Sequence, residues 1–233
     1  RVRVARGYAE LDSTLACLGF DSATPASCGR PIGPAGPEAR AETYVGAYPP
    51  TYYLLVGWPS HLFDPRGALY AMRLVSAAIS AALLASAVRA LLEAAGPAGT
   101  PGWAVGGVVL AATPIATFLI GGVNPSGLEV AAACCWWAST LVFLGGRGAA
   151  PCDRAGPVPD LGRPSTRAAV RFAVSGVLLV GTRPLSPFLA AAALAVVAVA
   201  AAPRLRSLRR SPQLVGGLGV VAVAAATAVV FGL

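Results

Sequence analysis

Gly121-Gly-Val-Asn-Pro-Ser-Gly-Leu-Glu129 is the stretch that decides the fold, because it interrupts two long apolar runs with polar and helix-breaking residues. Trp103 to Ile120, before it, carries no charge, and Leu128 to Leu144, after it, carries only Glu129. Apolar runs of about 17 to 25 residues are long enough to cross the hydrocarbon core of a bilayer as helices. The sequence therefore predicts a turn at a membrane surface between two membrane helices.

The residues of this turn predict how it is built. Asn124 before Pro125 favours a turn, Ser126 is able to cap the next helix, and Glu129 falls in that helix's first turn, where the helix dipole favours a carboxylate. An ionisable residue this close to lipid marks a candidate functional site, and a plain capping role is the alternative.

Composition extends the membrane interpretation to the whole chain. Hydrophobic residues make up 56% and charged residues 12%, whereas a soluble domain has roughly 25% charged residues. The net charge of +8 comes from arginines that sit mostly in short segments between apolar runs. This placement is typical of the positive-inside bias of membrane proteins, so nucleic acid is not expected as a partner.

Residues 1–66 are predicted to form a long extracytoplasmic loop with short helices, because Arg1 to Asp64 is polar, rich in proline and has no stretch long enough to span. Val2 to Phe20 is predicted as a short helix on the surface. If the loop lies outside the cytoplasm, Cys17 and Cys28 are able to form a disulfide, although the sequence leaves their separation open.

Aromatic residues and prolines are dense just before the first apolar run, from Tyr44 to Trp58. Tyrosine and tryptophan concentrate at membrane interfaces, so most of them are expected to be interfacial anchors. The alternative is that Tyr48, Tyr52 and Tyr53 form a wall for a lipid or sugar ligand. No metal site is expected, because the single histidine has no second histidine or cysteine nearby.

Residues 67–233 are predicted to form an all-α, polytopic transmembrane bundle of about six helices. The predicted helices are Ala68–Ala95, Trp103–Ile120 with a kink at Pro114, Gly127–Leu144, Ala168–Gly181, Phe188–Ala202 and Leu214–Leu233. Because the chain starts at Arg1 and stops inside an apolar run, we expect a fragment of a longer protein with further helices at both ends.

The arginines orient this predicted bundle. The basic loops at Gly145–Thr166 and Pro203–Arg210 fall on the same side, which the positive-inside rule makes cytoplasmic. The opposite surface receives the N-terminal loop, the Asn124 turn and the Thr182-Arg183-Pro184 turn. Arg183 is the one cation of its turn, which suits a phosphate or carboxylate partner, with a snorkelling surface arginine as the alternative.

These stretches together resemble an uncharacterised bacterial membrane-protein family, domain of unknown function 2142. The resemblance lies in Tyr48-Pro49-Pro50-Thr51-Tyr52-Tyr53 with Arg73-Leu74 downstream, in Thr113-Pro114 followed by Gly122 to Glu129, and in Arg183-Pro-Leu-Ser-Pro187. It covers most of the chain, and the order and spacing of the motifs make it specific.

That family looks like a relative of the glycosyltransferases with the C-type fold. The resemblance implies a multi-pass protein of the bacterial cytoplasmic (inner) membrane, with its N-terminal loop outside, that transfers sugar from a polyprenyl-phosphate donor to a cell-envelope glycan. It implies a catalytic acidic residue that would fall upstream of Arg1, so this chain alone is expected to be inactive. No cofactor is indicated here, although the resemblance leaves room for a divalent metal in the full-length protein.

Within that implied chemistry, positive charge is needed near the departing phosphate and hydrogen bonds are needed at the sugar. Arg183 would take the phosphate, Asn124 and Ser126 would bond sugar hydroxyls, and Glu129 would position the Asn124 turn. The loop carboxylates Asp12 and Asp21 are expected to be solvated rather than catalytic.

Two further functions stay open at this stage. A transporter or flippase of lipid-linked or small polar substrates would also show polar breaks and an intramembrane carboxylate. Here the breaks lie on one face and no internal repeat is visible, which favours the transferase. A non-catalytic envelope-assembly subunit is the third alternative.

Overall fold

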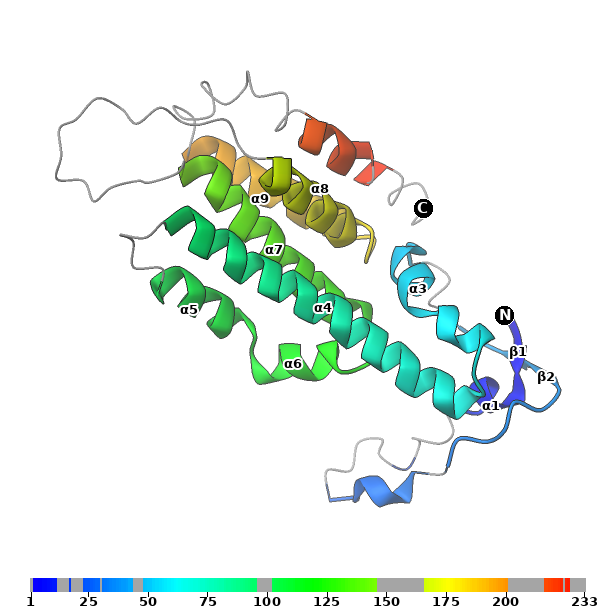
Figure 1. The fold of residues 1–233 in the computed structure, drawn as a ribbon. Coiled ribbons are helices and arrows are strands. Elements are labelled where there is room, and N and C mark those ends of the chain that lie inside the picture. Colours follow the sequence, from blue (N-terminus) through cyan, green and yellow to red (C-terminus); the bar gives the residue numbers. More distant parts are fainter. Residues whose placement is uncertain are drawn as a thin grey trace, which may run out of the picture.

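The fold is a helical bundle preceded by a small, irregular N-terminal region (Figure 1). The structure is a computed structural model, and it describes residues 2–11, 17, 23–29, 31–43, 48–95, 102–145, 166–200, 216–223 and 225–226. The bundle contains α4 (Pro65–Ala95), α5 (Gly102–Ala111), α6 (Pro114–Ile120), α7 (Pro125–Gly145), α8 (Thr166–Val180) and α9 (Ser186–Ala200). The all-α class predicted for the bundle is confirmed.

The longest helix is α4, which begins three residues before its predicted start. Pro65 fits its first turn, because proline has no N–H to leave unpaired there. Its 31 residues rise about 46 Å, more than the roughly 30 Å of hydrocarbon in a bilayer. Among the described residues, α4 is the one single helix long and apolar enough to span a membrane.

The prediction that Trp103 to Ile120 forms one continuous helix is wrong. Instead of a kink at Pro114, the chain breaks into α5 and α6. The residue before a proline is pushed out of the helical region, and Thr113 is extended, with φ −58° and ψ 161°. Its hydroxyl then accepts a hydrogen bond from the N–H of Ala116 at 3.2 Å, which starts α6 as a separate helix.

The junction between α6 and α7 is bent by 116°. Only together are the two helices long and apolar enough to cross a membrane, as a broken span or a re-entrant loop, so the described residues hold one candidate span, or up to two. The prediction of about six spans therefore stays a prediction. For the sixth predicted helix, residues 216–223 and 225–226 are helical. Residues 146–165 and 201–215, which hold the arginines of the two basic loops, lie outside the described residues.

Helix α7 packs between α4 and α8, and the core lies along these two contacts. Small buried residues, among them Ala87 on α4 and Ala132 on α7, let the backbones approach closely, as is common in membrane bundles. The ring of Trp136 on α7 stacks on Phe172 of α8, with ring centroids 5.7 Å apart. This packing determines how α4, α7 and α8 lie against one another.

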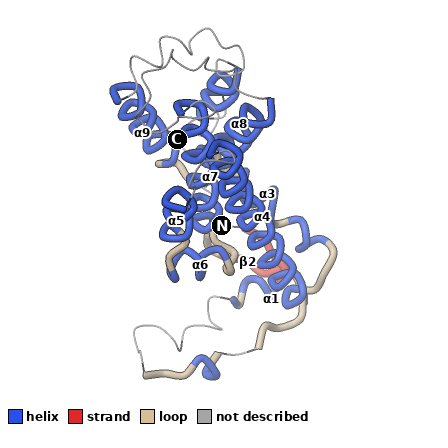
Figure 2. The backbone as a smooth tube through the Cα atoms, turned by 60° about the vertical axis from the view of Figure 1, so that its left-hand side comes forward, coloured by secondary structure: helices blue, strands red, loops and turns tan. Residues whose placement is uncertain are grey.

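The N-terminal region differs from its prediction. Its elements are β1 (Val2–Ala5), α1 (Arg6–Ala9), η2 (Ala26–Cys28), β2 (Glu38–Ala41), α3 (Thr51–Val56) and η4 (Trp58–His61). The predicted helix from Val2 is wrong at its start, because Val2 to Ala5 pairs as an antiparallel strand with Glu38 to Ala41. The sheet and α1 lie beside the beginning of α4 (Figure 2), where a side chain on Gly7 would meet Pro65.

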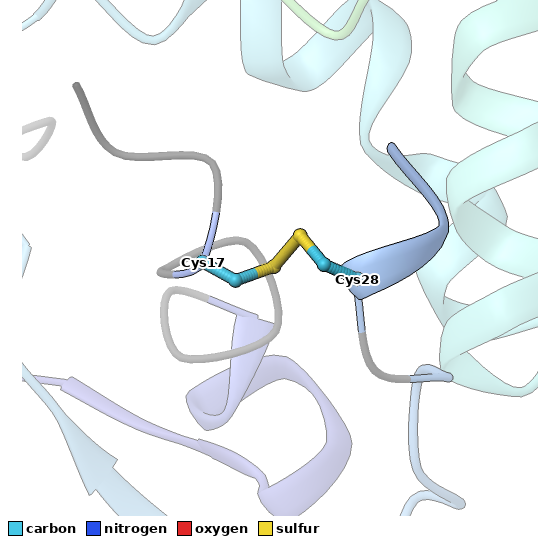
Figure 3. The surroundings of a disulfide bond; sticks show 2 residues. All are labelled: Cys17 and Cys28. Atoms are coloured by element: carbon cyan, nitrogen blue, oxygen red, sulfur yellow. A yellow bond between two sulfur atoms is a disulfide. The ribbon is translucent and has the colours of Figure 1, made fainter. Parts of the chain in front are cut away.

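A disulfide joins Cys17 to Cys28 in this region (Figure 3), with the two Cα atoms 6.2 Å apart. Cys28 is the last residue of η2, and the two cysteines are 11 positions apart in the sequence. Asp12 and Asp21, the two loop carboxylates, lie outside the described residues.

Candidate functional site

Three stretches far apart in the sequence meet at one end of the bundle: α3 with the residues before it, the turn between α6 and α7, and the turn between α8 and α9 (Figure 1). Tyr52 of α3 is completely buried and its hydroxyl lies 3.2 Å from the Ser76 hydroxyl of α4. The backbone of Asn124, in the α6–α7 turn, lies near the same hydroxyl. Tyr52 therefore holds α3 against α4, next to the α6–α7 turn.

The turn before α7 is capped by a different residue from the one predicted. Asn124 Oδ1 accepts a hydrogen bond from the Ser126 N–H at 2.9 Å, so Asn124 is the N-cap and Ser126 is its partner. Asparagine is among the best N-cap residues, because its short side chain reaches the free N–H groups of the first turn. The Asn124 oxygen is thus committed to the helix.

Glu129 reaches across to the α8–α9 turn. Its Oε1 accepts a hydrogen bond from the Ser186 hydroxyl at 2.6 Å, and its Oε2 lies 3.6 Å from a terminal nitrogen of Arg183. The expectation that Glu129 positions the Asn124 turn is replaced by these contacts. Ser186, buried at the start of α9, was missed by the sequence analysis, although a serine opening a helix is a recognisable capping signal.

Tyr48 lies on the other side of Arg183. The guanidinium is 5.9 Å from the centre of the Tyr48 ring, a cation–π distance. A hydrogen bond with Tyr48 raises the pKa of Arg183, and the carboxylate of Glu129 acts in the same direction. Arg183 is therefore a permanent cation, held between an aromatic face and a carboxylate.

Tyr53 completes the aromatic cluster next to this cation. Its ring meets that of Tyr52 edge to face, with centroids 5.2 Å apart. Burial raises the pKa of Tyr53 to about 12, and the neighbouring Tyr52 and Tyr48 act in the same direction. Tyr53 therefore stays protonated at any physiological pH and brings no second charge to the cluster.

A cavity of about 530 Å³ opens next to Arg183. We call it the Arg183 pocket. Its polar end is formed by Tyr48, Glu129 and Arg183, and its remaining lining is apolar: Val130, Ala133, Trp136, Trp137, Leu179, Pro184, Leu185, Leu189, Ala190 and Ala193. Leu185 and Leu189, two of the apolar lining residues, are largely exposed.

The pocket sorts the predicted site residues into two groups. Tyr48, Glu129 and Arg183 line it, whereas Tyr52, Tyr53, Asn124 and Ser126 do not. The sequence analysis did not single out Trp136 or Trp137, and both line the pocket. Nothing in the sequence separates a lining tryptophan from a packed one, since the distinction depends on where α9 lies.

No metal centre is found among the described residues, which hold no group of three or more histidine, cysteine or acidic side chains able to bind an ion. Cys134 and Cys135 are free thiols inside α7. Adjacent helical residues point in different directions, so these two thiols make a poor pair of metal ligands.

A comparison with models of protein families gives a match. A family model described as "Predicted membrane protein (DUF2142)" matches residues 26–232, a range that includes Tyr48, the α6–α7 turn, Glu129 and Arg183. No curated protein and no solved structure matches the chain.

Proposed function

This chain belongs to the DUF2142 family of predicted membrane proteins, and from the lining of the Arg183 pocket we propose that it binds a lipid-linked phosphate. The observation that carries the proposal is the division of one pocket into a polar end, which holds the Arg183 guanidinium beside the Glu129 carboxylate, and an apolar remainder. A polyprenyl phosphate has the same division: a dianionic head and a branched hydrocarbon chain. The head would meet Arg183 and the chain would leave over Leu185 and Leu189.

Arg183 is suited to this role by its geometry. A guanidinium presents several N–H donors in a planar fork that matches phosphate oxygens. The Arg183 side chain is 41% exposed, and its contact with Glu129, at 3.6 Å, is longer than an ordinary hydrogen bond. The cation is thus oriented by Glu129 and Tyr48 while part of it still faces the pocket.

The resemblance to C-type-fold glycosyltransferases extends the proposal to a reaction. The full-length protein would transfer sugar from a polyprenyl-phosphate donor to a cell-envelope glycan at the extracytoplasmic face. Arg183 would stabilise the charge that develops on the departing phosphate. Glu129 already accepts from Ser186 and pairs with Arg183, so we assign it to positioning Arg183 and not to proton abstraction.

A transporter or flippase is the second candidate, supported by the 116° break between α6 and α7. Broken helices in transporters often build the substrate site. The two functions differ in their product: a transferase releases sugar from a labelled lipid-phosphate donor, whereas a flippase moves the intact donor across a vesicle membrane.

Phosphate binding is testable on the purified chain in detergent, because two tryptophans line the pocket. We expect farnesyl phosphate to change the tryptophan fluorescence at concentrations at least about tenfold lower than farnesol, which has the same chain and no charge. Trp137→Phe should remove most of the change. Trp58→Phe, on η4 and away from the pocket, is the matched control and should keep it. Equal responses to the phosphate and the alcohol would show that the pocket binds only the hydrocarbon chain and does not recognise the phosphate.

A further inference from the structure

A second cavity, of about 770 Å³, lies at the opposite end of α8 from the Arg183 pocket, between α8 and the last turns of α4. We call it the Arg171 cavity. Its polar lining consists of Ser86, Arg89, Glu93, Thr166, Arg167 and Arg171. None of these residues takes part in the site described above.

The side chain of Arg171 is held in place at this cavity by neighbouring groups. Its side chain is only 14% exposed, its Nε donates to the Ser86 hydroxyl at 2.9 Å, and a terminal nitrogen lies 3.4 Å from a carboxylate oxygen of Glu93. The hydroxyl of Ser86 and the carboxylate hold the guanidinium at the wall of the cavity. An arginine held in this way loses little conformational freedom when it binds an anion.

The positive charge of the cavity exceeds its negative charge. Glu93 is shared between Arg171 and Arg89, whose terminal nitrogen lies 3.8 Å from the second carboxylate oxygen. Arg167 lies in the first turn of α8 and is exposed. Three guanidinium groups thus face one carboxylate, and the N-terminus of α8 adds the positive end of a helix dipole. The excess favours an anion with at least one full negative charge.

Below this polar rim the lining becomes apolar. Val170 and Val174 line the cavity one turn apart on α8, and both are more than half exposed. In a membrane protein this face meets hydrocarbon, so the cavity offers a cationic rim and an apolar floor to the same molecule. Basic pockets between membrane helices are a known way to bind phospholipid head groups.

We propose that the Arg171 cavity binds the phosphate-bearing head group of an anionic phospholipid, with an acyl chain lying along Val170 and Val174. The shared chemistry is a phosphate anion, which a soluble phosphate could also supply. The apolar floor favours the lipid. This site stands independently of the function proposed for the Arg183 pocket, because the two lie at opposite ends of α8.

Native mass spectrometry of the purified chain in detergent tests the proposal. Titration with dioleoyl phosphatidylglycerol should give one bound lipid at a concentration about thirtyfold lower than dioleoyl phosphatidylcholine, whose head group carries no net charge. The variant Arg89→Gln/Arg167→Gln should bring the two lipids to within about threefold. Both residues lie at the rim and are exposed, so the fold should be preserved.

Arg66→Gln is the matched control, since Arg66 is an exposed arginine at the other end of α4. It should leave the preference for phosphatidylglycerol intact. The proposal is overturned if both lipids bind the wild type equally, or if Arg66→Gln weakens binding as much as the double variant. Competition by inorganic phosphate alone, at millimolar concentration and independent of any acyl chain, would overturn the lipid assignment.

Discussion

Arg183→Ala should raise the dissociation constant of farnesyl phosphate at least about tenfold, because a charge-assisted, bidentate contact is lost, while farnesol binding stays unchanged. The tryptophan fluorescence titration described above measures both ligands. Arg183→Lys should retain part of the phosphate affinity, since an ammonium keeps the charge and loses the planar fork.

Glu129→Gln separates ligand binding from a purely structural ion pair. The glutamine still accepts the Ser186 hydrogen bond but no longer competes with phosphate for Arg183. We therefore expect farnesyl phosphate to bind as tightly as in the wild type or more tightly. If Glu129→Gln and Arg183→Ala both weaken phosphate binding to the same extent, the pair serves the fold and the binding proposal for Arg183 fails.

Gly127→Ala should destabilise the site end of the bundle. A Cβ on Gly127 would lie 2.6 Å from the carbonyl oxygen of Leu119 and 2.7 Å from the nitrogen of Ile120, both backbone atoms of α6. Because backbone cannot give way as a flexible side chain can, α6 and the start of α7 must separate. Overpacking of this kind costs about 1–3 kcal/mol.

Thermal unfolding of the chain in detergent measures this effect, and Gly106→Ala is the matched control. A Cβ at Gly106, on α5, meets nothing within 4 Å, and alanine is the better helix former by about 1 kcal/mol. We expect Gly127→Ala to lower the melting temperature and Gly106→Ala to leave it unchanged or raise it. Equal melting temperatures for Gly127→Ala and the wild type would mean that α6 and α7 do not pack as described.

Much of the bundle could be predicted from the sequence, because membrane helices leave a long apolar run between polar breaks. The apolar run from Ala68 to Ala95 predicted the ends of α4 to within three residues, and Asn124-Pro125 predicted the start of α7. The alternation of helix ends also indicated that Tyr48, the Asn124 turn and Arg183 lie on one surface.

The contacts at that surface could not be predicted. Glu129 and Arg183 are separated by 54 positions in the sequence. Their pairing depends on the rotation of α7, α8 and α9 about their own axes relative to one another. That rotation is set by packing, such as Trp136 on Phe172, which no periodicity encodes. The break at Thr113 was missed for another reason: a proline inside an apolar run is compatible with either a kink or a stop.

Photocrosslinking at Leu189 tests most directly whether the Arg183 pocket holds a lipid phosphate. Leu189 lines the pocket on α9 and is 64% exposed, whereas Phe118 on α6 is 75% exposed and lies outside the lining. With p-benzoylphenylalanine replacing either residue, radiolabelled farnesyl phosphate should crosslink at position 189, and excess unlabelled farnesyl phosphate should suppress it while farnesol does not. Equal labelling at positions 189 and 118, or equal suppression by farnesol, would contradict the proposal.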